Sequence, residues 1–244
     1  MLFAVIAVVF VATLVRSTFG FGEALVAVPL LAIVMPLQIA VPLCVLVSIL
    51  VALIVVVQDH RVIHIDSAKW LIVFALLGIP LGLWLLVSAD PRWVKVVLGG
   101  VIIAYSAYAL VAKQSLHLEQ DHRAWLFACG LLSGVLGGAY GLNGPPLVIY
   151  GNLRRWSAQH FRATLQAYFL VTSIIGLAGY TAKGLVSGVV LRDFALSLPA
   201  VIPAVFLGRH FNRKLRGAMF FTYVHVGLLM IGIVLVALTL ANVA

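Results

Sequence analysis

The chain has 244 residues, of which 64% are hydrophobic and only 9% are charged. A soluble domain usually has about 25% charged residues, so this composition excludes an ordinary soluble protein. The formal charge of +9 comes from 16 Lys and Arg residues that are scattered among short polar segments, and such scattering excludes a nucleic-acid partner. Because a membrane-spanning helix needs about 20 apolar residues, the length allows about eight to ten helical passes. We therefore expect an all-α polytopic integral membrane protein.

The first half begins with two short apolar runs, 2–15 and 24–34. Between them lies Arg16-Ser17-Thr18-Phe19-Gly20-Phe21-Gly22-Glu23, where glycines allow the chain to leave the helical conformation. Neither run is long enough to span comfortably, so we predict a broken helix that folds back as a hairpin. Three full spans should follow, at 37–57, 70–88 and 94–112.

The second half repeats this order after the polar segment 113–123. An apolar arm, 124–136, leads to a stretch rich in Gly and Pro, 137–146, and then to a short arm, 146–151. Further spans are predicted at 163–182, 193–208 and 218–241. An unpaired backbone group costs several kcal/mol in hydrocarbon, so each break should be enclosed by protein or line a polar cavity.

The two halves align weakly at an offset of 117 residues, which places Gly20 on Gly137 and Leu25 on Leu142. We interpret 1–112 as a first transmembrane repeat, 113–123 as a cytoplasmic linker and 124–244 as a second repeat. Each repeat would consist of a Gly-rich broken-helix hairpin and three transmembrane helices.

The basic residues indicate the orientation of the repeats, since cytoplasmic loops are enriched in Lys and Arg. If the basic loops near 152–162 and 209–216 are cytoplasmic, eleven of the 16 basic residues lie inside, four lie outside, and Arg16 stays at membrane depth. The two repeats are then inverted, and both termini are periplasmic. The inner set is Arg61, Lys69, Lys113, Arg123, Arg154, Arg155, Arg162, Arg209, Arg213, Lys214 and Arg216, and the outer set is Arg92, Lys95, Lys183 and Arg192.

Two segments carry a family resemblance. Phe19–Leu30 and Gly137–Tyr150 resemble the two signature regions of the TauE/SafE sulfite exporter family of 4-toluene sulfonate uptake permease-like membrane transporters, and Arg154-Arg155-Trp156 and Phe161–Gln166 extend the resemblance. The first segment has Phe21-Gly22-Glu23 where the family typically has a run of glycines. The resemblance implies a multi-pass transporter of sulfite, organosulfonates or related anions in the bacterial inner membrane.

The candidate substrate-binding residues lie at the two breaks. Just before Pro145 and Pro146 the chain could start a half-helix, whose free N–H groups and positive dipole end attract an anion. Asn143 could cap that helix or offer its amide to an oxyanion, whereas the alternative is that these small residues only let helices pack closely. The predicted set is Gly20, Gly22, Gly137, Gly138, Tyr140, Gly141, Asn143 and Gly144, together with Arg162 and Gln166.

Arg16 and Glu23 are the candidate charge and coupling residues, because charges at membrane depth are costly unless they are paired or reach a water-filled cavity. Glu23 could transfer protons and Arg16 could attract the anion, or the two could form a structural ion pair. Arg162 and Gln166 lie one helical turn apart and could extend donors towards the break, although Arg162 also suits a topology anchor. Thr172 and Ser173 could donate as well.

Together these features predict a secondary transporter that moves a sulfur-containing anion by alternating access. The alternatives are an anion channel, a membrane-embedded enzyme and a structural subunit. The sequence has no Walker motif, paired carboxylates or HExxH at membrane depth, so we predict no enzyme activity and no cofactor. His60 and His64 lack further ligands at suitable spacing, so no metal site is expected. The expected partners are a small anionic substrate, the lipid bilayer, protons as coupling ion and a second copy in a homodimer.

Overall fold

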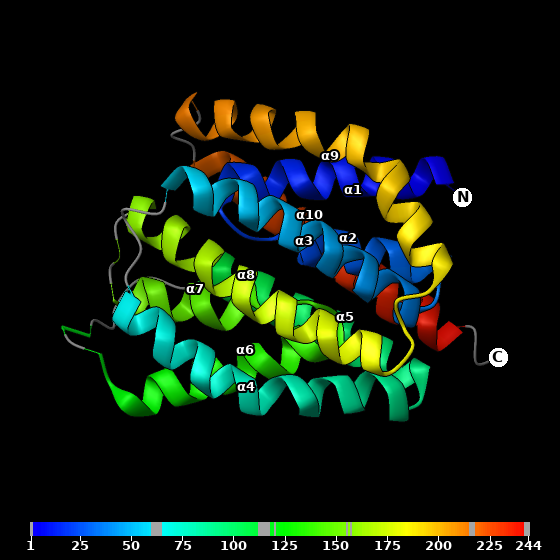
Figure 1. Cartoon of the computed structure of the whole chain (residues 1–244), viewed down its shortest axis with the longest axis horizontal. Coiled ribbons are helices and arrows are strands. Elements are labelled where there is room, and N and C mark those ends of the chain that lie inside the picture. Colours follow the sequence, from blue (N-terminus) through cyan, green and yellow to red (C-terminus); the bar gives the residue numbers. More distant parts are fainter. Residues whose placement is uncertain are drawn as a thin grey trace.

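The computed structural model describes residues 2–59, 65–111, 118–119, 121–154, 156, 158–214 and 218–241, so His60 and His64 lie outside the described residues. The described residues form ten α-helices and no β-strand, which confirms the predicted all-α class (Figure 1). The helices are α1 (Leu2–Phe19), α2 (Glu23–Val34), α3 (Leu37–Asp59), α4 (Ile65–Ser88), α5 (Pro91–Val111), α6 (Arg123–Tyr140), α7 (Gly144–Leu153), α8 (Ala158–Ala182), α9 (Gly188–Lys214) and α10 (Ala218–Ala241).

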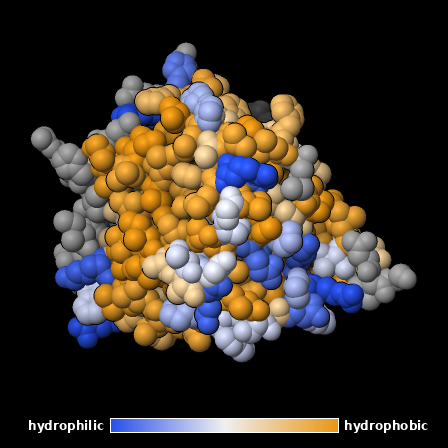
Figure 2. Space-filling view, turned by 45° about the vertical axis from the view of Figure 1, so that its right-hand side comes forward, coloured by the Kyte–Doolittle hydropathy of each residue, from blue (hydrophilic) through white to orange (hydrophobic). Residues whose placement is uncertain are grey.

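Six of the described helices, α1, α3, α4, α5, α8 and α9, are long and apolar enough to cross a membrane. Many of their large apolar side chains point outward, among them Trp84, Trp93 and Phe206, which are each more than half exposed. Hydrophobic residues cover most of the molecular face in Figure 2. Such a surface would be unstable in water but is matched to lipid, which confirms a multi-pass membrane protein.

Both helix breaks are shorter than the sequence predicted. Helix α1 continues through Phe19, so the first break is only Gly20–Gly22, and α6 continues through Tyr140, so the second is Gly141–Asn143. Helix α9 also begins earlier than residue 193 and ends later than residue 208. The predicted breaks were too long because every glycine near them was treated as a helix end, whereas Gly137 and Gly138 remain helical in α6.

Those helical glycines let α6 lie directly against α4. A Cβ atom added to Gly134 would be 2.3 Å from the carbonyl oxygen of Ala75, and one added to Gly138 would be 2.2 Å from that of Ile79. On the facing helix, a Cβ at Gly82 would be 2.0 Å from the carbonyl oxygen of Val135. Small residues on both helices therefore bring the backbones into contact, as is common between membrane helices.

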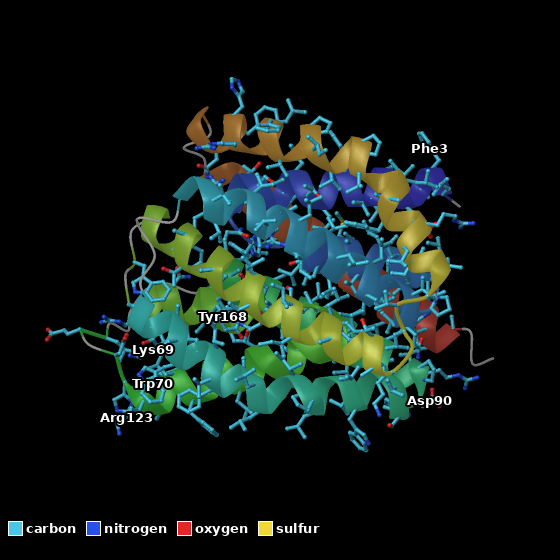
Figure 3. The ribbon with its side chains drawn as sticks, in the orientation of Figure 1. Phe3, Lys69, Trp70, Asp90, Arg123 and Tyr168 are labelled. Atoms are coloured by element: carbon cyan, nitrogen blue, oxygen red, sulfur yellow. The ribbon has the colours of Figure 1, made fainter. Side chains whose placement is uncertain are left out.

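The two halves of the chain run in opposite directions. Phe3, near the start of α1, and Arg123, at the start of α6, lie at opposite ends of the molecule (Figure 3). The packing partners correspond as well, since α1 packs along α9 and α6 along α4, while α3 packs on α8 and α5 on α10. This arrangement agrees with the predicted inverted repeat, although the boundaries at 112 and 124 stay a prediction.

The predicted offset of 117 residues between the halves was wrong. Helices α1, α2 and α3 correspond in their bounds to α6, α7 and α8 at an offset of 121 residues, which pairs Gly20 with Gly141. The local geometry agrees, because the N–H of Gly20 donates to the carbonyl of Arg16 and that of Gly141 to the carbonyl of Gly137. Each is a left-handed glycine that ends its helix. The match of Leu25 with Leu142 was a coincidence of apolar composition.

Polar loops at one end of the molecule are those predicted to lie inside. Lys69, Trp70 and Arg123 lie together at that end, whereas Phe3 and Asp90 lie at the other (Figure 3). Helix α1 begins and α10 ends at the same end as Asp90 (Figure 1). The described helix ends are therefore grouped as predicted, and the compartment that each end faces stays a prediction.

Candidate functional site

The two helix breaks meet at a small internal cavity of about 30 Å³. The sharp turns at both breaks require positive backbone φ angles, 99° at Gly22 and 68° at Gly141, which glycine adopts without steric cost. The cavity is lined by Arg16, Gly22, Glu23, Ala24, Leu25, Cys44, Ser48, Gly141, Leu142, Asn143, Gly144, Pro145 and Phe169. This volume is enough for two or three water molecules, since each needs about 10–15 Å³ of cavity volume measured in this way.

Two half-helices point their N-terminal ends into this cavity from opposite ends of the molecule. Helix α2 has 12 residues and α7 has 10, so at about 1.5 Å per residue they extend about 18 Å and 15 Å from the cavity. Together these lengths match a bilayer core of about 30 Å, which places the cavity near its middle. Two positive dipole ends therefore converge at one point.

The α2 end offers more backbone donors than the α7 end. The first N–H groups of any helix have no intrahelical acceptor, and Ala24 and Leu25 in the first turn of α2 line the cavity. In α7 the corresponding positions are Pro145 and Pro146, which have no N–H at all. A bound anion would thus find its backbone donors mainly on α2.

Arg16 is the cationic centre of the cavity and is only 2% exposed. Its Nη1 donates to the carboxylate of Glu23 and, at 2.6 Å, to the hydroxyl of Ser48, while its Nη2 donates to Oε1 of Gln166 at 2.8 Å. The guanidinium also lies 5.1 Å from the ring centre of Phe169. The structure thus brings together Arg16 and Glu23 as an ion pair at the cavity wall.

Unused hydrogen-bonding atoms remain around this ion pair. Nε of Arg16, Oε1 of Glu23 and Oδ1 of Asn143 are buried and have no hydrogen-bond partner among the described residues. A buried polar atom without a partner costs about 1–3 kcal/mol. Of these three atoms only Nε of Arg16 is a donor that a bound anion could use, since the two oxygens accept hydrogen bonds.

Gln166 positions Arg16 but does not line the cavity. While its Oε1 accepts from Arg16, its Nε2 donates to the carbonyl of Gly20 at 2.8 Å, so the side chain ties α8 to the first break. Ser173 on the same helix lies 3.4 Å from Ser48, oxygen to oxygen. Gln166 and Ser173 of α8 thus hold Arg16, Ser48 and the first break from behind the cavity wall.

Asn143 is held by α8 and α6 and does not cap α7 with its side chain. Its Nδ2 donates to Oγ1 of Thr172 at 2.9 Å, and that hydroxyl donates in turn to the carbonyl of Tyr168. Since the Thr172 proton is used there, the amide nitrogen must face Thr172, and Oδ1 faces Gly137. The carbonyl of Asn143 accepts from Ser133 at 2.7 Å.

The remaining predicted residues lie near the breaks but not on the cavity wall. A Cβ added to Gly137 would be 2.0 Å from Oδ1 of Asn143, and Gly138 packs against α4. Tyr140 donates to the carbonyl of Val94 at 2.9 Å. The side chain of Arg162 covers Gly20 and donates to Asn212 at 3.3 Å. These positions fit the close-packing alternative better than direct contact with a ligand.

Ser48 and Phe169 are cavity residues that the sequence reading missed. Ser48 is the only hydroxyl in the apolar span 37–57, and that isolation was a usable signal, since a polar side chain at membrane depth usually has a partner. Phe169 gave no signal, because an aromatic residue in an apolar span is indistinguishable from a lipid-facing one until the fold is known.

A polar cluster at the Lys69 end fixes the far end of α7. Asp121 accepts hydrogen bonds from Tyr150 at 2.6 Å and Ser67 at 2.8 Å, and its carboxylate lies 2.9 Å from Nε of Arg154. Burial alone would raise the pKa of Asp121, but the bonds from Tyr150 and Ser67 and the charge of Arg154 outweigh it and hold that pKa below its ordinary value. The half-helix α7 is therefore fastened to α4 and to the segment before α6.

The model of the family described as "Sulfite exporter TauE/SafE" matches residues 5–235. The "Probable sulfite/organosulfonate exporter TauE" of Cupriavidus necator is 27% identical to the chain over 112 residues, which are 46% of this chain and 44% of that protein. The match thus spans less than half the length of that relative, and no solved structure matches the chain. Since the family model covers nearly the whole sequence, the chain belongs to the sulfite exporter TauE/SafE family.

Proposed function

We propose that the protein is a secondary carrier that moves a small sulfur oxyanion, sulfite or a sulfonate, across the bacterial inner membrane. The observation that supports this most strongly is the buried Arg16 at the point where both helix breaks meet. A guanidinium, two helix N-termini and the hydroxyl of Ser48 all favour a ligand with negatively charged oxygens. The membership of the family and the name of the C. necator relative support the sulfur chemistry.

In this proposal Glu23 takes the place of the substrate while the carrier is empty. Its carboxylate accepts a hydrogen bond from Nη1 of Arg16, which is the donor that an incoming oxyanion would use. When the oxyanion displaces it, the carboxylate would lose its partner in a buried place, and protonation would then remove the cost of an unpaired charge. Anion binding and proton uptake at Glu23 would therefore be linked, which makes protons the coupling ion.

The small volume of the cavity supports a carrier over a channel. A space of about 30 Å³ is too small for an organosulfonate, so loading requires another conformation. Helices that run in opposite directions around a central site are typical of carriers that alternate between two openings. In such a cycle α2 and α7 would each line the site from one side of the membrane, and the break glycines would absorb the backbone changes.

Equilibrium binding of sulfite and of methanesulfonate to the purified protein tests the site. Asn143→Ala removes from the cavity wall the second N–H of Nδ2, which Thr172 does not use. Asn152→Ala removes an exposed amide from α7. Because a hydrogen bond to a charged group contributes about 1.5–3 kcal/mol, the first variant should bind at least about tenfold more weakly, and the control should bind like the parent. Equal affinity of both variants would remove Asn143 from the anion site.

A further inference from the structure

A second, larger cavity lies where α2 ends, α5 begins and α10 ends, at the end of the molecule that carries Asp90 (Figure 3). Its volume is about 240 Å³, and it does not share any residue with the central cavity. The walls combine apolar residues with two basic residues and a threonine, and they are formed by Ala32, Ile33, Pro91, Arg92, Lys95, Leu235, Leu238 and Thr239.

The charges of this cavity are of one sign. Arg92 and Lys95 contribute two cations from successive turns of α5, and the lining residues include no carboxylate. The apolar lining residues Ile33 and Leu238 are each 45% exposed, so the cavity opens towards the lipid-facing surface. Trp93, between the two cations in sequence, is exposed as expected at the level of lipid headgroups.

Lys95 connects this cavity to the central site. Its ammonium donates to the carbonyl of Ala32 at 2.7 Å, near the C-terminal end of α2, and the N-terminal end of the same helix lines the central cavity. An ammonium has three donors, so two remain for a ligand in the outer cavity. A ligand here would therefore contact the residue that binds the C-terminal end of α2.

From this combination we propose that the outer cavity binds an anionic phospholipid. The phosphate would lie on Arg92 and Lys95, and an acyl chain would follow the apolar groove formed by Ile33 and Leu238. Two cations beside an apolar, lipid-open wall suit an amphipathic anion, whereas a small hydrophilic oxyanion would leave most of the 240 Å³ and its apolar wall unused. This proposal does not depend on the transported substrate.

The test uses the purified protein in nanodiscs and measures the retention of phosphatidylglycerol against phosphatidylcholine by native mass spectrometry. The variant Arg92→Gln/Lys95→Gln removes both cations. Lys183→Gln serves as the matched control, because Lys183 is exposed and lies beyond α8, outside the cavity. A second arm adds inorganic phosphate as a competitor at a concentration well above that of the lipid.

The proposal predicts that the double variant loses the preference for phosphatidylglycerol by about tenfold or more, while Lys183→Gln keeps it. Inorganic phosphate should not displace the lipid. An equal loss in Lys183→Gln would mean general surface attraction and would overturn the site. Displacement by inorganic phosphate would overturn the lipid assignment, because the cations would then bind any anion of that charge. If the double variant remains folded and retains phosphatidylglycerol as the parent does, both the site on Arg92 and Lys95 and its assignment to a lipid are overturned.

Discussion

At the scale of single residues, the protein places a full positive charge in its interior and surrounds it with polar partners from three helices. Arg16 comes from α1, Ser48 from α3 and Gln166 from α8, while Glu23 begins α2. The planar guanidinium can serve these partners at once because its donors are spread over a fixed fork. A lysine carries its three donors on one nitrogen and lacks this spread. We therefore expect the charge and the geometry of Arg16 to be needed together.

The ion pair predicts a specific pattern of loss and rescue. Arg16→Gln leaves the Glu23 carboxylate buried without a counter-charge, so the free energy of unfolding should fall by about 3–5 kcal/mol. Adding Glu23→Gln removes that charge, and the double variant should regain most of the stability without regaining anion binding. Thermal unfolding in detergent and calorimetric titration with sulfite measure the two effects. If the double variant is no more stable than Arg16→Gln, the buried ion pair between Arg16 and Glu23 is contradicted.

Only one of the polar partners of Arg16 could be predicted from the sequence. The spacing of Arg16 and Glu23 predicted that they could pair, because charges at membrane depth need partners. Ser48 and Gln166 lie 32 and 150 residues from Arg16, and no local pattern relates such positions. Only the packing of α3 and α8 against α1 and α2 brings them to the cavity.

At the scale of the elements, close backbone packing between α4 and α6 keeps the second break in position. Gly134 faces Ala75 with no room for a side chain, whereas Gly100 on α5 has no heavy atom near the place of a Cβ. Gly134→Ala should therefore destabilise the fold by about 1–3 kcal/mol through overpacking. Gly100→Ala is the matched control and should be neutral or slightly stabilising, because alanine favours helix. Thermal unfolding of both proteins in the same detergent checks this, and equal melting temperatures would refute the close contact.

The Asp121 cluster predicts a dependence of stability on pH. Because the folded-state pKa of Asp121 lies below its ordinary value, its contribution is complete above pH of about 4 and is lost as the pH falls through the folded-state pKa. Asp121→Asn should lower stability at neutral pH by about 1 kcal/mol, since the carboxylate is partly exposed to solvent. Melting temperatures between pH 3 and pH 7 should fall with acid more in the parent than in the variant. Parallel curves would exclude Asp121 as the titrating group.

Element positions were predicted well where apolar runs were long and poorly where glycine was frequent. The spans near 37–57 and 94–112 correspond to α3 and α5, because runs of this length and polarity have few alternatives in a bilayer. The breaks were misplaced by a few residues, because Gly137 and Gly138 can either end a helix or let it pack against another. The choice depends on α4, which lies far away in the sequence.

At the scale of the whole molecule, opposite directions of the two halves place one half-helix on each side of the central cavity. The sequence predicted this from loop charges, since an inverted arrangement puts most Lys and Arg residues at one end. The observed ends agree, with Lys69 and Arg123 together and Asp90 opposite (Figure 3). A reporter enzyme active only in the periplasm, fused after Ala244, should therefore be active. A fusion at Lys69 should be inactive, and the reverse pattern would contradict the orientation.

The most direct test of the carrier is flux of sulfite and methanesulfonate into proteoliposomes of the purified protein, with and without a pH gradient. We predict saturable flux that responds to the gradient, and a Glu23→Gln variant that still exchanges anions but no longer responds to pH. Flux that rises linearly with concentration and ignores the gradient in both proteins would contradict a proton-linked carrier built around Arg16 and Glu23.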